Sequence, residues 1–533
     1  MRSSFQRTSL SRKSLLPASL ALALLVALSA VVAPLDARAQ SAAESTLLEQ
    51  FEEKTTTFTL DNGLTFVVIE RHDAPVISFH TYADVGAVDE PMGQSGLAHL
   101  FEHLAFKGTT SIGTKDIESE MASIAREEEI FEQIERERAR RPRADTARIA
   151  RLEARLDSVE EQSKEYLSDG GYDQILERNG VSGLNAYTGA DQTGYVYSLP
   201  SNKLELFFAL ESDRFLNPVF REFYTERDVV MEERRQRTES SPIGRLLEEF
   251  TTTAFKAHPY GIPTIGHMSD LERLSREDAR AFFDKYYGPS NLTIGIAGDV
   301  DPARAKQLAE KYFSRLEGGE EPIGVSTEEP EQISERRVII RERSQPTVIM
   351  GWHRPSMFSD EAAVYDVLQD ILTQGRTSRL YKTLVEEEKA LRVQAFPSYP
   401  GSKYPTLFGI IGVPNREVGP EQLEEDIYTV LEDIKENGVS TEEVERAKTR
   451  ARAQLVNSLD SNDGLARSFS RMEELTGSWR EVFQNLDAIQ RVTAADVQRV
   501  AQETFQRSNR TVAMIKTFGD EDDEASEATA SAE

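Results

Sequence analysis

Two histidines and a glutamate lie within five residues near position 100, in the order His99, Glu102 and His103. In a helix, His99 and His103 share one face, with Glu102 beside them. Imidazole is a good zinc ligand, and a neighbouring carboxylate can take a proton from a metal-bound water. With 7 His and 91 acidic residues in 533, chance would give about 0.016 such patterns per chain. The pattern therefore predicts a divalent metal site rather than two histidines at a polar boundary.

A third ligand can come from the charged segment Tyr224 to Arg235. Glu226 and Glu233 are seven residues apart, so a helix places them two turns apart along one face. Two imidazoles and one carboxylate would leave a fourth position for water, as in catalytic zinc sites. Charged helices also carry such glutamates for solvation, so spacing alone leaves both interpretations open. The chain has no Cys, so zinc would have to be held by His and carboxylate.

Strand-like runs flank the metal motif and are separated by turn residues. The segment 76–82 is a predicted strand that leads through Gly86 and Gly93 into the motif helix, which places the site where a strand gives way to a helix. An apolar-turn-apolar pattern around Asp61-Asn62-Gly63 predicts a hairpin before it. Together the predicted strands cover 57–60, 64–69, 76–82, 183–188 and 193–198, with a helical pattern at 203–216.

Residues 117–167 differ in composition from their surroundings. They contain runs of Glu, Arg and Ala with apolar residues at helical spacing, and the break at Arg141-Pro142-Arg143 predicts two antiparallel helices. A charged hairpin of this kind is most often a solvated insertion. The alternative is a lid or docking arm beside the metal.

An internal repeat indicates that two halves of the chain share one fold. Each copy has a capped helix, a Ser-Asn turn and a strand. The correspondence pairs 275–279 with 493–497, and 290–294 with 508–512. A polar, acidic stretch with Gly and Pro lies between the copies and is the predicted linker. The predicted layout is a first, zinc-binding domain at 46–316, a linker at 317–335 and a second domain at 336–518.

The two ends of the chain have different compositions from the rest. Four basic residues precede an apolar run, and Ala37-Arg38-Ala39 then offers a small-x-small cleavage site, so 1–39 is predicted to be a secretory signal peptide. The alternative is an uncleaved membrane anchor, although the run is short. We therefore expect a periplasmic or secreted protein without stable membrane insertion. Residues 519–533 are acidic without an apolar pattern and are predicted to form a disordered tail.

The net charge of −29 argues against nucleic acid as a partner, because a phosphate backbone would be repelled over most of the surface.

These residues together resemble the pitrilysin/insulinase family of zinc peptidases, in the branch that includes the mitochondrial processing peptidase. The resemblance covers roughly residues 57–518. His99, Glu102 and His103 match the family's inverted metal motif, and residues 104–109 continue it. The segment from Glu226 to Glu233 matches the one that carries the family's third ligand.

The resemblance implies a role for each of these side chains. Zn²⁺ would be bound by His99, His103 and Glu233, with Glu226 as a supporting carboxylate. Glu102 would take the proton of the attacking water and pass it to the leaving amine. The implied activity is zinc-dependent cleavage of peptide bonds.

Asn185, Ala186, Tyr187 and Thr188 match the edge strand on which such enzymes lay out a substrate peptide. Added as a further strand, the peptide would be held by backbone hydrogen bonds, and selectivity would be broad. Phe106 is a candidate wall of the site, with a core role as the equal alternative. The implied fold class is α+β, with two homologous α/β roll domains that form a clam shell around an unfolded peptide. The charged helical hairpin would be an insertion in the first domain.

The chain departs from the family pattern in two places. The hairpin lengthens the distance between the motif helix and Glu233. In the second half, the positions that normally carry a substrate-contacting Arg and Tyr are Val385 and Arg392. We therefore expect a related second subunit, or a homodimer, that supplies the missing donors. The alternative functions are a non-catalytic scaffold, as in family members that are subunits of respiratory complexes, or a protein that holds peptides without cleaving them.

Overall fold

The computed structural model describes residues 47–168 and 170–517 of the chain. By its internal contacts the chain divides into residues 1–54 and residues 55–533, and both sheets lie in the second, larger unit. The predicted signal peptide at 1–39 and the predicted tail at 519–533 lie outside the described residues. Over the described residues, no helix combines the length and the apolar character needed to cross a membrane.

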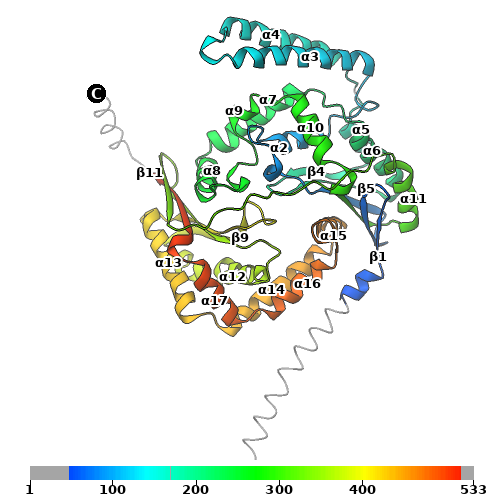
Figure 1. The fold of residues 1–533 in the computed structure, drawn as a ribbon. Helices are drawn as coiled ribbons and strands as arrows, with labels where there is room; N and C mark the ends of the chain where they lie inside the picture. Colours follow the sequence, from blue (N-terminus) through cyan, green and yellow to red (C-terminus); the bar gives the residue numbers. More distant parts are fainter. Residues whose placement is uncertain (1–46, 169, 518–533) are drawn as a thin grey trace, which may run out of the picture. The chain divides into compact units, whose positions relative to one another are not determined.

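A six-stranded sheet forms the centre of the first half of the larger unit, residues 55–316 (Figure 1). Its central strands β6 and β3 are almost entirely buried, because both faces are covered. The Asp61-Asn62-Gly63 turn joins β1 and β2 as expected, with Gly63 at φ +98°. The strand order is β1 (Thr55–Thr59), β2 (Thr65–Glu70), β6 (Leu292–Gly298), β3 (Val76–Ala83), β5 (Thr193–Pro200) and β4 (Ser182–Thr188).

A five-stranded sheet occupies the second half, residues 336–517, and repeats this topology. In the first sheet β2 and β6 are parallel, and β3, β5 and β4 follow as antiparallel neighbours. In the second sheet β7 and β11 are parallel, and β8, β10 and β9 follow in the same way. The strand order is β7 (Arg336–Glu342), β11 (Arg510–Thr517), β8 (Thr347–Arg354), β10 (Thr406–Pro414) and β9 (Ala390–Tyr399). The expected α+β class with two related halves is confirmed.

The repeat detected in the sequence extends to the caps of the helices. Ser275 caps α10 (Arg276–Tyr286) in a capping box with Asp278, and Thr493 caps α17 (Ala494–Thr504) in the same way with Asp496. Each helix leads through a short 3₁₀ turn into an inner strand, β6 or β11. The local signals that marked the repeat therefore mark equivalent places in the fold.

Each half contributes one helix to the sheet of the other half. Helix α8 (Pro242–Ala254) packs against β7, β8 and β11, and α15 (Asn462–Thr476) packs against β2, β3 and β6. The approach of α15 is close, because a Cβ on Gly295 would lie 2.3 Å from the carbonyl oxygen of Ala466. The two halves are therefore joined by an exchange of helices and not only by the linker.

The remaining helices cover the two sheets. Those of the first half are α2 (Leu97–Leu104), α5 (Tyr172–Arg178), α6 (Leu204–Leu216), α7 (Phe223–Arg234), α9 (Met268–Leu271) and α11 (Pro302–Phe313). Those of the second half are α12 (Ala362–Thr373), α13 (Pro420–Asn437), α14 (Thr441–Ser458) and α16 (Glu481–Arg491). Residues 317–335, the predicted linker, contain neither helix nor strand.

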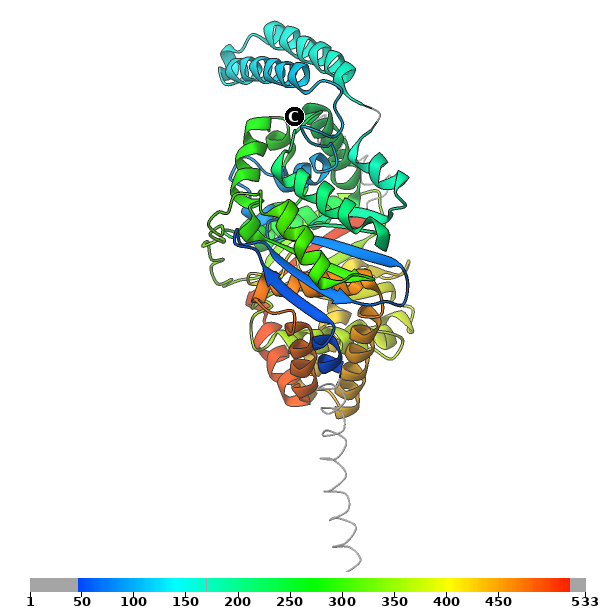
Figure 2. The ribbon, with the colours of Figure 1, turned by 90° about the vertical axis from the view of Figure 1, so that its right-hand side faces the viewer.

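The predicted helical hairpin is present as α3 (Ile117–Arg138) and α4 (Thr146–Ser163), which pack against each other (Figures 1 and 2). Asp116 and Asp145 cap their N-termini. The connection contains Pro142, which cannot continue α3 because it lacks a backbone N–H. The expectation of two helices with a break at 141–143 is confirmed.

The inner face of the hairpin is buried. The prediction that the hairpin is a solvated insertion is therefore wrong for that face. Arg221 is 2.7 Å from Glu120, and Arg276 is 2.8 Å from Glu127, with all four side chains almost fully buried. Apolar residues of both hairpin helices also belong to the core of the first half: Ile130, Phe131, Ile134, Leu152, Leu156 and Val159. Because the ring of Tyr224 of α7 lies 4.7 Å from that of Phe131, the hairpin packs against the helix that carries Glu226 and Glu233.

Candidate metal centre

Gly96 is the N-cap of helix α2, and its φ of +94° is in the left-handed region that glycine tolerates. A Cβ on Gly96 would lie 2.7 Å from the side chain of Leu271 and 2.9 Å from the carbonyl oxygen of Ile265. One side of the helix packs its apolar residues into the core of the first half. The side with His99 and His103 faces α7. Burial of the apolar side fixes the rotation of the helix and so directs the two imidazoles towards α7.

The N-terminus of α2 is held by a carboxylate that the sequence analysis missed. Glu90 is buried and accepts the backbone N–H groups of Gly96 at 2.8 Å and Ala98 at 2.7 Å. A helix N-terminus has unpaired N–H groups and a partial positive charge, so a carboxylate stabilises it. Burial raises the pKa of Glu90 well above its usual value. Its six-residue separation from the helix start is longer than a standard capping motif, so no local signal marked it.

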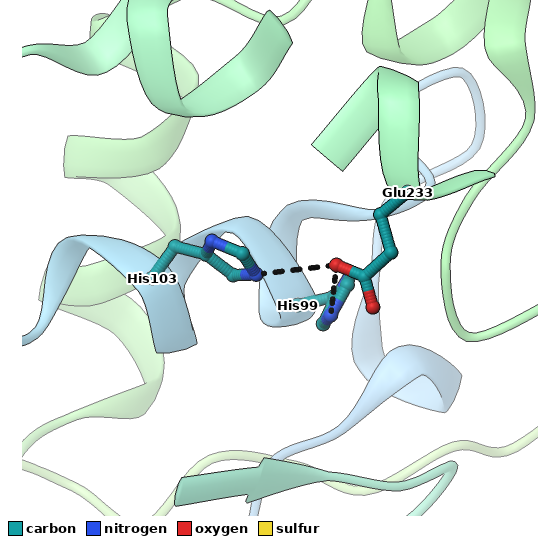
Figure 3. Close-up of side chains that lie close together, drawn as sticks. All are labelled: His99, His103 and Glu233. Carbon is teal, nitrogen blue, oxygen red and sulfur yellow. Dashed lines mark ion pairs between the residues drawn. The ribbon is translucent and has the colours of Figure 1, made fainter. Parts of the chain in front are cut away.

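His99, His103 and Glu233 converge on one point between α2 and α7 (Figure 3). Glu233 Oε2 is 3.7 Å from His99 Nε2 and 3.5 Å from His103 Nε2, and one donor atom from each residue lies within 4.8 Å of the others. No other group of three or more His, Asp or Glu side chains in 47–168 and 170–517 is arranged to hold a metal ion. Two imidazoles and one carboxylate fit Zn²⁺ and leave a coordination position for water or substrate.

Glu226 lies behind His103, on the side away from Glu233. Its Oε2 is 3.3 Å from His103 Nδ1, and its Oε1 is 2.5 Å from the ammonium of Lys107. Burial alone would raise the pKa of Glu226, but the hydrogen bonds from His103 and Lys107 outweigh it and lower that pKa. A charged Glu226 accepts the Nδ1–H of His103 and leaves the Nε2 lone pair directed at the cluster. The hydrogen bond to Glu226 is also the main cause of the raised pKa of His103.

His99 is buried, and its Nδ1 has no hydrogen-bond partner among the residues that the structure describes. Burial lowers the pKa of His99 to about 4. The imidazole is therefore neutral at pH 7, which is the protonation state that a metal ligand needs.

Glu102 lies beside the cluster and not in it. Its Oε2 accepts a hydrogen bond of 2.6 Å from the hydroxyl of Thr188, so the carboxylate lies between α2 and β4. Burial raises the pKa of Glu102. Thr188 was expected only as part of a substrate strand, and its bond to Glu102 is a contact that sequence spacing could not show.

Strand β4 is the last strand of its sheet and pairs with β5 on one side only. It contains Asn185, Ala186, Tyr187 and Thr188, with Asn185 exposed. The hydroxyl of Tyr187 is 2.9 Å from Nε2 of His80, so its side chain is held against the sheet. Over the described residues no strand pairs with the other edge of β4, and β4 lies beside α2.

Phe106 follows the end of α2 and packs edge-on against Tyr172 and Tyr195, with ring centroids 6.0 and 6.1 Å away. It is partly buried at the border of the core of the first half. These aromatic contacts are explained by packing in the core, without any contact between Phe106 and a substrate.

The second half has no counterpart of the cluster among the residues that the structure describes. Helix α12 follows β8 as α2 follows β3, and α14 precedes α15 as α7 precedes α8, so α12 and α14 are the equivalent pair. Between them lies an ion pair of Asp370 with Arg450, whose Nε is 2.8 Å from Asp370 Oδ2. A salt bridge therefore occupies the place of the ligand set.

At the two second-half positions where the family pattern has an Arg and a Tyr, this chain has Val385 and Arg392. Val385 packs against the core of the second half, and Arg392 is exposed on the edge strand β9. Arg379, a nearby arginine, is bonded to Glu443 at 2.7 Å and Asp433 at 2.9 Å. It therefore stabilises the second half.

Comparison with protein families gives two matches along the chain. The family described as "Insulinase (Peptidase family M16)" matches residues 66–135 and 160–267. The family described as "Peptidase M16 inactive domain" matches residues 273–451. The unmatched stretch 136–159 covers the far end of the helical hairpin, so that end is specific to this chain relative to the family pattern.

Similar proteins cover most of the chain. "Zinc protease PqqE" of Helicobacter pylori is 28% identical over 469 residues, which are 86% of this chain and 92% of that protein. "Probable mitochondrial-processing peptidase subunit beta" of Schizosaccharomyces pombe is 27% identical over 470 residues, 84% of this chain and 88% of that protein. The crystal structure of a protease from Helicobacter pylori has a TM-score of 0.72 at 25% identity and covers 87% of this chain and 99% of that chain.

These matches agree with the fold class predicted from the sequence, a mixed helix and sheet fold in two related halves whose arrangement is consistent with a clam shell. They extend over both halves, so the similarity is not confined to the metal motif. The chain belongs to the M16 family, the pitrilysin/insulinase family of zinc peptidases.

Proposed function

We propose that the chain is a zinc-dependent endopeptidase that cleaves unfolded peptides or unfolded segments of proteins. The observation that supports this most strongly is the convergence of His99, His103 and Glu233 within 4.8 Å, with the carboxylate of Glu102 beside them. An open three-ligand set with an adjacent base is the arrangement used by zinc hydrolases.

In this proposal His99, His103 and Glu233 hold the zinc ion, and Glu226 orients His103. Zinc, when bound, polarises the scissile carbonyl and makes its water more acidic. Glu102 accepts a proton from the attacking water and delivers it to the nitrogen of the leaving amine. The hydroxyl of Thr188 holds one oxygen of Glu102, so the other remains available for the proton.

The peptide substrate pairs with the open edge of β4 at Asn185, Ala186, Tyr187 and Thr188. Backbone groups of β4 would donate and accept the hydrogen bonds, so binding would depend on an extended conformation more than on particular side chains. Folded proteins would be poor substrates, because their backbone groups are already paired.

The site of action is proposed to be the periplasm or the outside of the cell, after removal of residues 1–39. This rests on the signal-peptide pattern in the sequence. We also infer a related second subunit, or a second copy of the chain, as partner, because Val385 and Arg392 replace the Arg and Tyr of the family pattern.

A non-catalytic scaffold or peptide-holding subunit is the alternative function. The description of one matching family as an inactive domain applies to residues 273–451, which do not contain the ligand cluster. A scaffold would not need a complete ligand set with a base beside it, so the intact cluster favours the peptidase.

The test is hydrolysis of an unstructured peptide by the chain starting at Gln40, alone and with any co-purifying partner. Zinc content is measured on the same samples, before and after chelation and after zinc is restored. His103→Ala and Glu233→Ala should lose both metal and activity. His72→Ala is a matched control, because His72 is exposed and bonded to Asp299 at 2.8 Å, away from the cluster. Metal-independent hydrolysis, or full zinc occupancy in Glu233→Ala, would contradict the proposal.

A further inference from the structure

One arginine beside the ligand cluster has no role in the proposal so far. A guanidinium nitrogen of Arg237 is 2.6 Å from Oε1 of Glu233, the oxygen that does not face the two histidines. The side chain of Arg237 is nevertheless 72% exposed. It is thus anchored at one point and open to a ligand over most of its surface.

The backbone at Arg237 is fixed although the side chain is exposed. Residues Arg235–Glu239 form a π-helical turn that continues α7, and such turns occur frequently at functional sites. A Cβ on Gly244 would lie 2.0 Å from the carbonyl oxygen of Arg237, so the start of α8 packs directly on this turn. Ser241 caps α8 at the same place through the N–H of Gly244. A fixed backbone keeps the guanidinium close to Glu233.

Arg237 is the cation at this site that still has donors to offer. Its contact with Glu233 places Arg237 beside the two histidines that Glu233 faces. Lys107 is bonded to Glu226 and Glu222, and the neighbouring Arg234 is bonded to Glu248 and to a backbone carbonyl. A guanidinium has five N–H groups, and within 47–168 and 170–517 Arg237 has a single ion-pair partner, Glu233.

We propose that Arg237 donates a hydrogen bond to the scissile carbonyl oxygen as negative charge develops on it. This rests on the proposed peptidase function. As water adds, a C–O bond forms, the carbonyl π electrons move to the oxygen, and the water proton goes to Glu102. Collapse restores the carbonyl, breaks the C–N bond and passes the proton to the amine. A donor that meets the charge on this oxygen acts on the rate rather than on substrate binding.

Arg237 would thus supply a donor from the first half, while in the second half Val385 and Arg392 stand in place of the Arg and Tyr of the family pattern. The isolated chain should therefore cleave peptides without a partner, and a partner should add to the rate and not create it. Arg379, the nearby arginine of the second half, is already bonded to Glu443 and Asp433.

The test compares Arg237→Ala and Arg237→Lys with Arg235→Ala as the matched control. Arg235 lies on the same turn, is 46% exposed and is bonded to Glu232 at 3.1 Å, outside the cluster. The measurements are kcat and KM on an unstructured peptide at saturating zinc, and the zinc dissociation constant by competition with a chelator. Arg237→Ala should lower kcat by about 10² to 10³ with KM and zinc affinity close to wild type. Arg237→Lys should recover part of kcat, and Arg235→Ala should behave as wild type.

Each other outcome is decisive. If wild type and Arg237→Ala have the same kcat, Arg237 does not contact the developing charge, and the proposed peptidase function stands. If Arg237→Ala loses zinc affinity but has normal kcat at saturating zinc, Arg237 only holds Glu233, and the inference is overturned. If zinc-loaded wild type does not cleave the peptide, both the function and the inference fail.

Discussion

Replacing Arg221 with Ala would leave a buried carboxylate without its cation. Arg221 Nε is 2.7 Å from Oε1 of Glu120, and the two residues are 3% and 1% exposed. The same guanidinium donates to the backbone carbonyls of Lys107 at 2.6 Å, Thr109 at 2.8 Å and Ile112 at 2.8 Å. It therefore joins the start of the hairpin helix α3 to the loop that follows the metal motif.

Removal of one partner from a buried pair costs about 3 to 5 kcal/mol, because the remaining charge is uncompensated. Since 1.4 kcal/mol is a factor of ten, the backbone amides of α3 should exchange with solvent about 10² to 4 × 10³ times faster if local opening controls exchange. The assay is hydrogen exchange followed by mass spectrometry. Arg136→Ala is the control, because Arg136 is 76% exposed and pairs with Glu132 on the surface of the same helix. Its loss should cost only about 0.3 to 0.5 kcal/mol.

A double variant separates the charge effect from lost packing. Arg221→Met with Glu120→Met removes both charges and should recover part of the protection, because an apolar pair can replace a buried ion pair. The carbonyls of Lys107, Thr109 and Ile112 would still lose their donor, so recovery should be incomplete. If the amides of α3 exchanged as slowly in Arg221→Ala as in Arg136→Ala, the hairpin would not depend on the Arg221–Glu120 pair, and the reasoning would be refuted. Deletion of the hairpin should likewise destabilise the first half, because buried Arg221 and Arg276 would lose their partners.

Three further predictions concern other sites. Glu226→Gln should weaken zinc binding by about 10- to 100-fold, since it removes the charged acceptor of His103; unchanged affinity in a chelator competition would contradict this. Hydrogen bonding from Arg379 lowers the pKa of Glu443 to about 2 from 4.5, so its stabilisation is present above pH 4.5 and is lost as pH falls towards 2. Glu443→Gln should therefore have a lower melting temperature than wild type at pH 7 and the same one near pH 2, and a difference independent of pH would show that Glu443 is not responsible. Gly295→Ala should lower the melting temperature, because its Cβ would lie 2.3 Å from the backbone of α15; a wild-type value would mean that α15 can move away at little cost.

The central part of the site was predictable because it is local. Two histidines four residues apart must share a helix face, so His99 and His103 could be paired without any tertiary information. The internal repeat was likewise visible, because capping residues and Ser-Asn turns have local sequence signatures. Both predictions concern residues whose geometry is determined within about one or two helical turns.

The third donor required more than spacing. Glu233 is 130 positions after His103, and nothing in a charged helix shows which helix it packs against. The family resemblance singled out Glu233, and the structure brings it to the histidines through the packing of α7 on α2. Its role as a ligand stays a prediction that metal binding must test.

The residues missed by sequence reasoning depend on long-range or irregular geometry. Glu90 reaches α2 across a left-handed glycine, and Arg237 lies on a π turn, and neither feature has a reliable sequence signature. The hairpin was expected to be solvated because its glutamates are charged. Its burial depends on Arg221 and Arg276, which are far away in the sequence and neutralise those charges.

The most direct test of the proposed function is made on one pair of proteins, wild type and Glu102→Gln, each assayed for bound zinc and for hydrolysis of the same unstructured peptide. The amide cannot accept a proton, while His99, His103 and Glu233 are untouched. We predict one zinc per chain in both proteins, with hydrolysis by wild type and none by Glu102→Gln. Hydrolysis by zinc-loaded Glu102→Gln at the wild-type rate would contradict the account.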